Sequence, residues 1–271
     1  MKIYKKFKES RNYNLPDSPR YYKNEFTNGS DGTAGLKLVT YNTNFSKKID
    51  KTIGFLQNEQ CLKDTDIVCL QEADHAGVER LSSLLEYNYV YYPAVLHPSH
   101  NRDFGNAVLT KYNITGDIKV ILNPEKTHHF NRIAVGARIE AGGINIVVVS
   151  VHMKVFMNAH DAGIQIAKLL DSSMLPGEAF IVAGDFNCYR KPKKDIIFNL
   201  FKDKEYIHAT DSLNWTFRKW YLFNKKFAVD HIFTKGLKVI SSGSIEYPFA
   251  NDHLSVWAEL RIIDETRKKI S

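Results

Sequence analysis

The sequence predicts one α/β domain in which two sheets pack face to face with helices on the outside. The 271 residues, 44% of them hydrophobic, can bury one large core and fall in the size range of a single domain. From Leu36 onward, short apolar runs of β-prone residues alternate with helical stretches, which is typical of layered α/β proteins. The order strand, helix, strand occurs once in each half, which indicates two sheets.

Residues 1–34 are polar, rich in Tyr, Asn, Pro, Lys and Gly, and show no sustained helix or strand period. We predict an N-terminal arm or lead-in over residues 1–34 and one domain over residues 35–271. The predicted strands of this domain are Leu36–Tyr41, Ile67–Leu70, Asn106–Leu109, Ile133–Ile139, Ile144–Val151, Phe180–Ala183, Val229–Phe233 and Ser255–Leu260.

Two helices are predicted between strands, around residues 53–56 and over residues 159–170. The apolar face of the second helix is expected to consist of Ile164, Ala167, Leu169 and Leu170. A single parallel sheet stays open as an alternative, because apolar runs of this length do not reveal how strands pair.

Charge and cysteine content narrow the class of protein. A net charge of +7 favours an anionic partner, such as nucleic acid or an acidic lipid surface. The three cysteines are odd in number, far apart and not in a Cys-x-x-Cys pattern, so they indicate neither a disulfide framework nor a thiolate zinc site. No apolar run is long enough to form a transmembrane segment, and the basic N-terminus lacks the apolar segment of a signal peptide. We therefore expect a cytoplasmic monomer.

Several predicted strands end in a polar residue of a type that catalysis uses. Asn42, Glu72, His152 and Asp185 each follow an apolar run directly, and Asn187 comes two residues later. In α/β proteins the carboxyl ends of strands form the rim where ligands bind. These side chains are therefore expected to converge at one mouth.

The C-terminal part adds more groups of the same kind. Asp230 opens one predicted strand, and Asp252 and His253 precede the last one. Together with Glu72 and Asp185, they form an acidic set in a basic protein, and crowded carboxylates repel each other unless a cation joins them. Scattered oxygen ligands suit Mg²⁺, which keeps several waters and takes only one or two carboxylates.

The segments that carry these residues resemble the endonuclease/exonuclease/phosphatase superfamily, whose fold is that of pancreatic deoxyribonuclease. The matching segments are Leu36–Asn42, Asp66–Glu72, Phe104–Thr110, Val149–His152, Val182–Asn187, Val229–Phe233 and Asn251–Val256. They follow the family's order and cover nearly everything beyond the arm. The resemblance implies a four-layer, DNase I-like sandwich and a metal-dependent phosphoric ester hydrolase.

The resemblance also implies a metal site. Glu72 would be the principal carboxylate ligand, with Asn42 and Asp252 near the ion as direct or water-mediated ligands. The implied ion is Mg²⁺, with Mn²⁺ able to substitute.

The resemblance further implies catalytic positions. Asp185 would orient or deprotonate the attacking water, and Asn187 would hold the phosphoryl oxygens. His253, oriented by Asp230, would contact the phosphate, and His152 would contact it from the other side. Phosphoryl transfer needs this combination of charge neutralisation and an aligned water.

The resemblance leaves one catalytic position open. A further Glu, Tyr or Arg is expected between Glu72 and His152, for which Arg102, Asp103 and Asn106 are candidates by position alone. The continuation after Asn42 departs from that of the abasic-site endonucleases, which disfavours abasic-site repair.

Nucleic acid is the favoured substrate, because basic residues interleave with aromatics near the expected mouth. These segments are Arg190–Lys194 and Arg218–Lys226, the latter with Trp220, Tyr221 and Phe223. A phospholipid, sphingomyelin or inositol phosphate is the alternative, with peripheral membrane contact.

Two other classes of protein are weighed against an esterase. A catalytically silent nucleic-acid or lipid-binding module is disfavoured by the intact acidic set. A zinc hydrolase would have to use residues that lack ligand spacing, namely His128, His129, His152 and His231.

Overall fold

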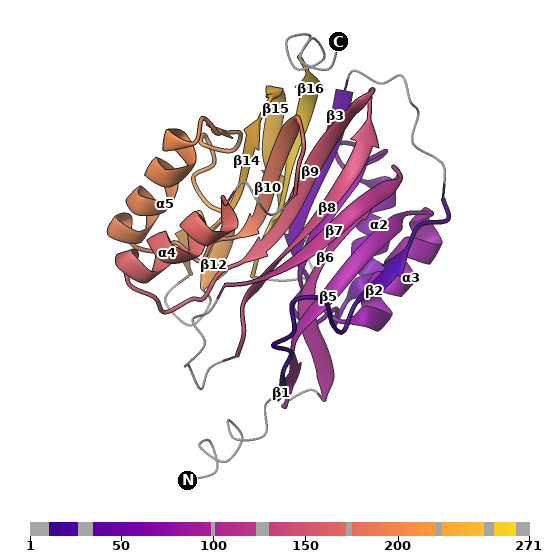
Figure 1. The fold of residues 1–271 in the computed structure, drawn as a ribbon, viewed down its shortest axis with the longest axis horizontal. Coiled ribbons are helices and arrows are strands. Elements are labelled where there is room, and N and C mark those ends of the chain that lie inside the picture. Colours follow the sequence, from indigo (N-terminus) through magenta and orange to yellow (C-terminus); the bar gives the residue numbers. More distant parts are fainter. Residues whose placement is uncertain are drawn as a thin grey trace.

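Two sheets pack face to face, and helices cover the outer face of each (Figure 1). The computed structural model describes residues 11–26, 35–98, 101–122, 130–171, 175–219, 224–246 and 252–263. The predicted two-sheet α/β sandwich is confirmed, and the alternative of a single parallel sheet is wrong.

The first sheet has eight strands. In spatial order they are β1 (Arg11–Asn12), β5 (Asn88–His97), β6 (Arg102–Thr110), β4 (Ile67–Ala73), β3 (Gly35–Asn42), β16 (Ser255–Ile262) and β15 (Leu237–Ile245), with β2 (Tyr21–Lys23) also paired to β5. Only β3 and β4 run parallel to each other among these described pairs.

The second sheet has six strands. Their order is β11 (Ile207–His208), β14 (Asp230–Lys235), β10 (Ala179–Asp185), β9 (Ile144–His152), β8 (Ile133–Ala141) and β7 (Ile114–Ile121). Strands β9 and β10 are parallel, as are β3 and β4 in the first sheet. A small hairpin of β12 (Phe217–Lys219) and β13 (Lys225–Phe227) stands apart from both sheets.

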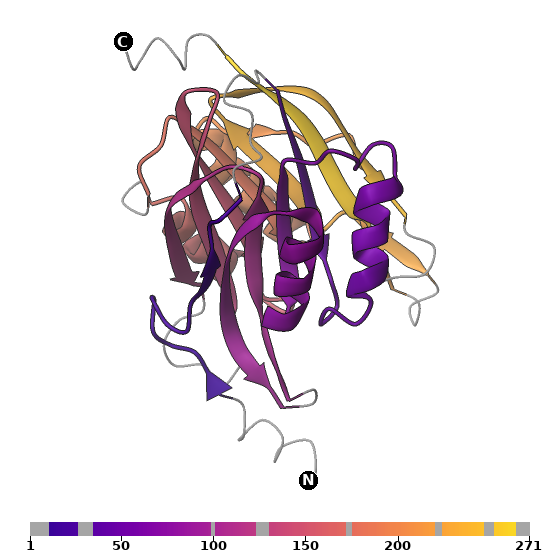
Figure 2. The same cartoon turned by 90° about the vertical axis from the view of Figure 1, so that its right-hand side faces the viewer.

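Each parallel pair is joined by a helix, as the strand, helix, strand order predicted. Helix α2 (Ile49–Asn58) links β3 to β4, and α4 (Ala159–Leu169) links β9 to β10. Helices α3 (His75–Leu85) and α5 (Lys191–Asp203) lie beside them on the same outer faces. Figure 2 shows α2 and α3 covering the first sheet. The layers are thus helix, sheet, sheet, helix.

The buried face of α4 differs from the prediction. Ile164 is 56% exposed, whereas Ala162 and Ile166 are buried. A side chain at Gly163 would meet Ile196 of α5 at 3.2 Å, so this side of α4 is pressed against its neighbour. The helix therefore buries a face that includes its small residues, and helical spacing of large residues alone could not reveal this.

The largest core lies between the two sheets. Its apolar side chains come from both inner faces and include Leu38, Ile67, Val108, Ile146, Ile181 and Val256. Each large side chain that is fully buried contributes roughly 1.5–3 kcal/mol to folding. Two further clusters lie between each sheet and its helices. Three stacked cores hold the strand ends in a fixed relation to one another.

Three long strands were missed, namely β5, β7 and β15. Pro93 lies within β5 at a register shift, and proline inside an apolar run argues against a strand from sequence alone. Strand β15 is half exposed and contains serines, so it lacks a strong apolar pattern. None of the described helices is both long and apolar enough to cross a membrane.

Candidate active site

The two sheets bring their catalytic candidates to one mouth through strand register. Asp185 at the end of β10 lies directly opposite His152 on β9 and Asp230 on β14. These three side chains therefore stand in a row across adjacent strands. The ends of β3 and β4 in the first sheet face this row and supply Asn42 and Glu72.

Glu72 is aimed by an irregularity in β4. The register of β4 against β6 shifts between Leu70 and Ala73, and Glu72 has a φ of 53°. Non-glycine residues seldom adopt this left-handed conformation, and such strain clusters at functional sites. The side chain is 21% exposed and places Oε1 3.9 Å from Nε2 of His152.

Gln71, beside Glu72, ties the two sheets together beneath the site. Its Nε2 donates to Oγ of Ser150 on β9 at 2.9 Å and to Oγ1 of Thr40 on β3 at 3.1 Å. Because all three residues are fully buried or nearly so, this contact fixes the spacing between the strand ends.

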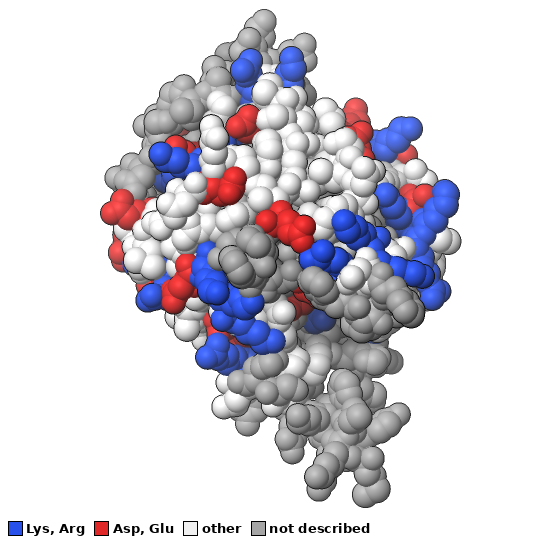
Figure 3. All heavy atoms as spheres, turned by 180° about the vertical axis from the view of Figure 1, so that it is seen from behind, with Lys and Arg blue, Asp and Glu red and all other residues white. Residues whose placement is uncertain are grey.

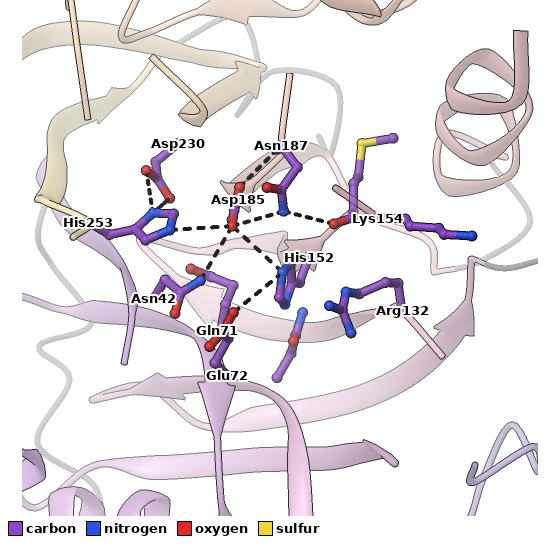
Figure 4. Close-up of polar contacts among 12 residues, drawn as sticks. Asn42, Gln71, Glu72, Arg132, His152, Lys154, Asp185, Asn187, Asp230 and His253 are labelled. Carbon is purple, nitrogen blue, oxygen red and sulfur yellow. Dashed lines mark hydrogen bonds and ion pairs between the residues drawn. The ribbon is translucent and has the colours of Figure 1, made fainter. Parts of the chain in front are cut away.

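Asp185 sits at the centre of the hydrogen bonds in Figure 4. Its Oδ1 accepts the backbone N–H of Asn187 at 2.9 Å, and its Oδ2 accepts Nδ2 of Asn187 at 3.0 Å and Nδ2 of Asn42 at 3.4 Å. Gly184 precedes it with a φ of 149°, and a Cβ there would lie 2.0 Å from the carbonyl oxygen of Val151. Only glycine fits this close approach.

His253 lies between two carboxylates. Its Nδ1 is 2.9 Å from Oδ2 of Asp230, and its Nε2 is 3.8 Å from Oδ2 of Asp185. Burial opposes a charge on the ring, but Asp230 and Asp185 outweigh it and raise the pKa of His253 to about 10. The imidazole is therefore a cation at neutral pH in the metal-free protein.

The Asp230–His253 pair is held in place by the segment before β12. Oγ1 of Thr216 accepts the backbone N–H groups of Val229 and Asp230 at 3.0 and 2.9 Å. Phe217 pairs with His253 through the backbone, and the two ring centroids are 4.6 Å apart. The dyad is thus pre-organised by buried contacts.

His152 has the opposite electrostatic setting. Burial, followed by the charge of Arg132, lowers the pKa of His152 well below its usual value, so the ring is neutral. Its Nε2 is 3.6 Å from Oδ2 of Asp185, and among the described groups its buried Nδ1 has no hydrogen-bond partner. A neutral imidazole can offer one N–H donor to a phosphate oxygen.

The carboxylates of the site fit a divalent cation. Burial raises the pKa of Glu72, and it raises the pKa of Asp185 to about 7, so the desolvation of these carboxylates outweighs the positive charges of Arg132 and His253 nearby. Asp252 acts on both Glu72 and His253 by its charge, so it lies at the same mouth.

Asp185, Asp230 and His253 offer ligand atoms within 4.8 Å of one another. However, Nδ1 of His253 already faces the Oδ1 and Oδ2 atoms of Asp230 at 3.1 and 2.9 Å, so this nitrogen is engaged by the carboxylate and is a poor candidate for a metal ligand. The oxygen donors on the Glu72 side remain the better match to a hard cation.

The structure identifies Arg132, which the sequence prediction missed. Its guanidinium points into the site (Figure 4) and lies over the ring of Phe104, with 5.1 Å to the centroid. Burial lowers the pKa of Arg132, while the charges of Glu72 and Asp185 oppose this. Arg132 directly precedes β8, which is antiparallel to β9, so its start shares an edge with the end of β9. The pairing of β8 with β9 is what places Arg132 at the mouth, and the strand-end pattern of the sequence does not reveal it.

The three residues proposed by position alone have structural contacts instead. Nδ2 of Asn106 donates to the carbonyl oxygens of Ile133 and Ser150, Arg102 pairs with Asp74, and Asp103 accepts the hydroxyl of Tyr13.

Lys193 belongs to the basic segment predicted to contact substrate, but the structure buries it. It is 4% exposed, and its Nζ donates to the carbonyl oxygens of Lys154 and Asn187 at 2.8 and 3.0 Å. It anchors the loops that carry two site residues.

The zinc alternative receives no support. His231 faces away from the carboxylates, with Nδ1 3.1 Å from Nε2 of His208 and Nε2 3.3 Å from Sγ of Cys188. His128 and His129 lie outside the described residues, as do Trp220, Tyr221 and Phe223 of the predicted basic and aromatic segment.

Comparison with known proteins agrees with this geometry. The model of the Endonuclease/Exonuclease/phosphatase family matches residues 39–253. Compared by sequence with curated proteins, the chain has no significant match.

Solved structures share the fold. An endonuclease/exonuclease/phosphatase from Bacteroides vulgatus has a TM-score of 0.68 and 18% identity over 85% of this chain and 100% of its own. D. rerio TDP2 complexed with single-strand DNA product has a TM-score of 0.68 and 14% identity over 84% and 100%. The human Nocturnin catalytic domain with bound sulfate anion has a TM-score of 0.62 and 18% identity over 90% and 98%.

The family match spans most of the chain and includes every residue brought together at the mouth. The chain therefore belongs to the endonuclease/exonuclease/phosphatase family of metal-dependent phosphoesterases.

Proposed function

We propose that this protein hydrolyses a phosphodiester with Mg²⁺ by direct attack of water, and that nucleic acid is its substrate. The observation that carries the proposal is that His253 lies between the carboxylates of Asp230 and Asp185, opposite Glu72. It places a cationic imidazole, a buried carboxylate and a candidate metal ligand around one mouth.

The residues divide the work by their charge. His253, cationic because of its two carboxylate neighbours, would bind a non-bridging phosphate oxygen and stabilise the charge that develops there. Arg132 would bind a second oxygen, and neutral His152 would donate one hydrogen bond. Asn187 would hold the phosphoryl group through its amide, giving up one of the two hydrogen bonds that its Nδ2 donates to Asp185 and to the carbonyl of Met153.

Asp185 is suited to accept a proton from water. Burial raises its pKa to about 7, which brings a carboxylate close to the optimum for a general base at neutral pH. Asn187 and Asn42 both donate to its oxygens, so its orientation is fixed before substrate binds.

Glu72, Asn42 and Asp252 are the residues that would hold Mg²⁺. When bound, the ion would neutralise charge on the phosphate and leaving oxygens. Mn²⁺ would substitute, because it accepts the same oxygen ligands.

The rim of the mouth supports a nucleic-acid substrate. Phe156 is 85% exposed, on a loop whose base is tied to the site because the carbonyl of Met153 accepts Nδ2 of Asn187 at 2.9 Å. On the hairpin side, Trp215 carries Nζ of Lys226 4.0 Å from its ring centroid and the guanidinium of Arg218 at 5.8 Å. Aromatic side chains and cations together are how single strands are commonly held, and here Phe156 offers an exposed ring and the half-buried Trp215 a ring beside two cations.

The charge on the surface is unevenly spread. Figure 3 shows Lys and Arg side chains in groups across the middle of the face opposite to that of Figure 1, with Asp and Glu between them. Such a surface attracts a polyanion without forming one continuous positive field.

Hydrolysis of a substrate panel tests the proposal. The panel contains single- and double-stranded DNA, RNA, sphingomyelin and phosphoinositide vesicles, and a bis-aryl phosphodiester, each with Mg²⁺ and with chelator. Asp185→Asn should abolish cutting, whereas Asp203→Asn, on an exposed turn of α5, should not. If no substrate is cut although the folded protein binds one of them, the protein is a binding module.

A rim variant separates the two substrate classes. Phe156→Ser should weaken binding of single strands by about 1–3 kcal/mol and leave the bis-aryl diester unaffected. Ile207→Ser, at a 53% exposed site, is the matched control. If Phe156→Ser instead abolishes cutting of vesicles and spares nucleic acids, the lipid-directed alternative is correct.

A further inference from the structure

We infer that the described part of the N-terminal arm, residues 11–26, positions Arg132 in the active site through Asn12, Tyr13 and Asn14. The inference rests on the proposed function, because it assigns the arm to phosphate binding. The arm precedes the part of the chain that the family model matches, which begins at residue 39. The arm therefore lies outside the part of the chain that the family model describes.

The arm is integrated into the first sheet. Strands β1 and β2 both pair antiparallel with β5, and the arm runs along this edge in Figures 1 and 2. In register, Asn12 lies opposite Val95, and the backbone N–H of Tyr13 donates to the carbonyl of Ala94 at 3.0 Å. These backbone contacts fix the side chains of residues 12–14.

Two of these side chains hold the residue before Arg132. Oδ1 of Asn12 accepts the backbone N–H of Asn131 at 3.0 Å, and Oδ1 of Asn14 accepts Nδ2 of Asn131 at 2.9 Å. Asn131 is 7% exposed, and both of these bonds are partly buried.

Asn131 in turn contacts the side chain of Arg132, the proposed phosphate ligand. The guanidinium of Arg132 donates to the carbonyl oxygen of Asn131 at 3.4 Å. The arm, Asn131 and the Arg132 side chain thus form one chain of contacts, and the charge of Arg132 interacts with those of Glu72 and Asp185.

A second set of contacts leads from the arm toward Phe104, the aromatic residue under Arg132. The hydroxyl of Tyr13 donates to Oδ1 of Asp103 at 2.8 Å, and Asp103 adjoins Phe104, whose ring lies under Arg132. The arm therefore contacts Asn131, which accepts a hydrogen bond from the guanidinium, and Asp103, the neighbour of the Phe104 ring under it.

The arm has its own anchor, distant from Arg132 in sequence. Nζ of Lys119 donates to the carbonyl oxygens of Tyr13, Leu15 and Ser18 at 2.9, 3.0 and 3.3 Å. Lys119 is 3% exposed, and a buried ammonium needs such acceptors. The segment from residue 13 to residue 18 is consequently held as one piece.

An arginine that binds phosphate benefits from such supporting contacts because its side chain is long and flexible. Its long side chain has many rotamers, so a site that uses it as a phosphate ligand must restrict them. A displacement of about 1 Å in a group that stabilises the transition state can lower the rate by about 10²-fold. Loosening the arm should therefore act on turnover more than on folding.

Variants of the two arm asparagines test the inference. Asn12→Leu and Asn14→Leu remove the acceptors, while Asn12→Asp keeps an acceptor of the same shape. Arg20→Ala is the matched control, because Arg20 lies in the same arm but pairs with Asp117 and does not contact Asn131.

Turnover of the diester that the wild-type protein cuts is the first measurement. We expect kcat to fall about 10- to 100-fold in the two Leu variants, to return in Asn12→Asp and to change less than about twofold in Arg20→Ala. Combined with Arg132→Met, Asn14→Leu should cause no further loss, because both variants disable the same group. A further loss of the full size, or equal effects in Arg20→Ala, would overturn the inference.

Binding of inorganic phosphate, measured by calorimetry, separates this inference from the proposed function. If the wild-type protein cuts nothing, Asn14→Leu and Arg132→Met should still weaken phosphate binding alike. If Arg132→Met weakens it and Asn14→Leu does not, the arm has no positioning role. If neither weakens it, Arg132 is not a phosphate ligand and the inference fails with it.

Discussion

Replacing Asp230 with Asn removes one negative charge and keeps the shape of the side chain. The carboxylate lies 2.9 Å from Nδ1 of His253, and both groups are buried. The asparagine amide can still offer its oxygen to the ring, so the geometry should survive while the charge is lost. The variant thus isolates the electrostatic part of the pair.

The size of the effect follows from the pKa of His253, which its surroundings raise to about 10. A nearby opposite charge shifts a pKa by about 1–3 units, and one unit corresponds to about 1.4 kcal/mol. A raised folded-state pKa stabilises the protein fully below the unfolded pKa, and this stabilisation is lost as pH rises through about 10. In Asp230→Asn, roughly 1–4 kcal/mol of stability at neutral pH should therefore disappear.

Two measurements check this prediction. NMR titration of the metal-free protein, with the His253 ring assigned from the spectrum of His253→Gln, should show its pKa lower by about 1–3 units in Asp230→Asn. With Mg²⁺, kcat should fall about 10²- to 10⁴-fold. An unchanged His253 pKa would show that Asp230 is not what keeps the ring charged, and unchanged turnover would remove the dyad from the mechanism.

Three other variants, two of them with a matched control, give further predictions. Lys119→Met should lower the free energy of unfolding by about 1–3 kcal/mol in urea titrations, because three partly buried carbonyl oxygens lose their donor, whereas Lys238→Met on the surface should not. Gly184→Ala should prevent stable folding or lower the melting temperature sharply, because its Cβ would collide with the backbone; Gly54→Ala, where nothing lies within 4 Å, should be neutral or stabilise by about 0.5–1 kcal/mol. Glu72→Gln should weaken Mg²⁺ binding in calorimetry and raise the Mg²⁺ concentration needed for half-maximal turnover; equal metal affinity would place the ion elsewhere.

The residues at the predicted strand ends show how much of the site can be predicted from local sequence pattern. Apolar runs ending in Asn42, Glu72, His152 and Asp185 indicated one mouth, and the structure brings these four side chains together. The pattern works because the carboxyl ends of parallel strands meet at one edge. Their catalytic and metal-binding roles, and the division at residue 34, stay predictions.

Local pattern failed where a residue's role depends on a partner far away in the chain. The spacing in α4 placed Ile164 on the buried face, but contact with α5 turns it outward. Arg132 precedes its strand rather than following one, so the strand-end rule passes over it. Only the antiparallel pairing of β8 with β9 reveals which edge it occupies.

By itself, the sequence determined the layered α/β class, the order of the strands that carry the site and the family, because these depend on local periodicity and on motifs within a few residues. Tertiary structure alone decided the bulge that aims Glu72, the place of Arg132 and the docking of the arm. Each of these joins residues that are remote in the chain or depends on a neighbouring strand, and the physical reason is the same for all. Register and side-chain contacts are set by which strands become neighbours, and that is fixed only when the sheets pack.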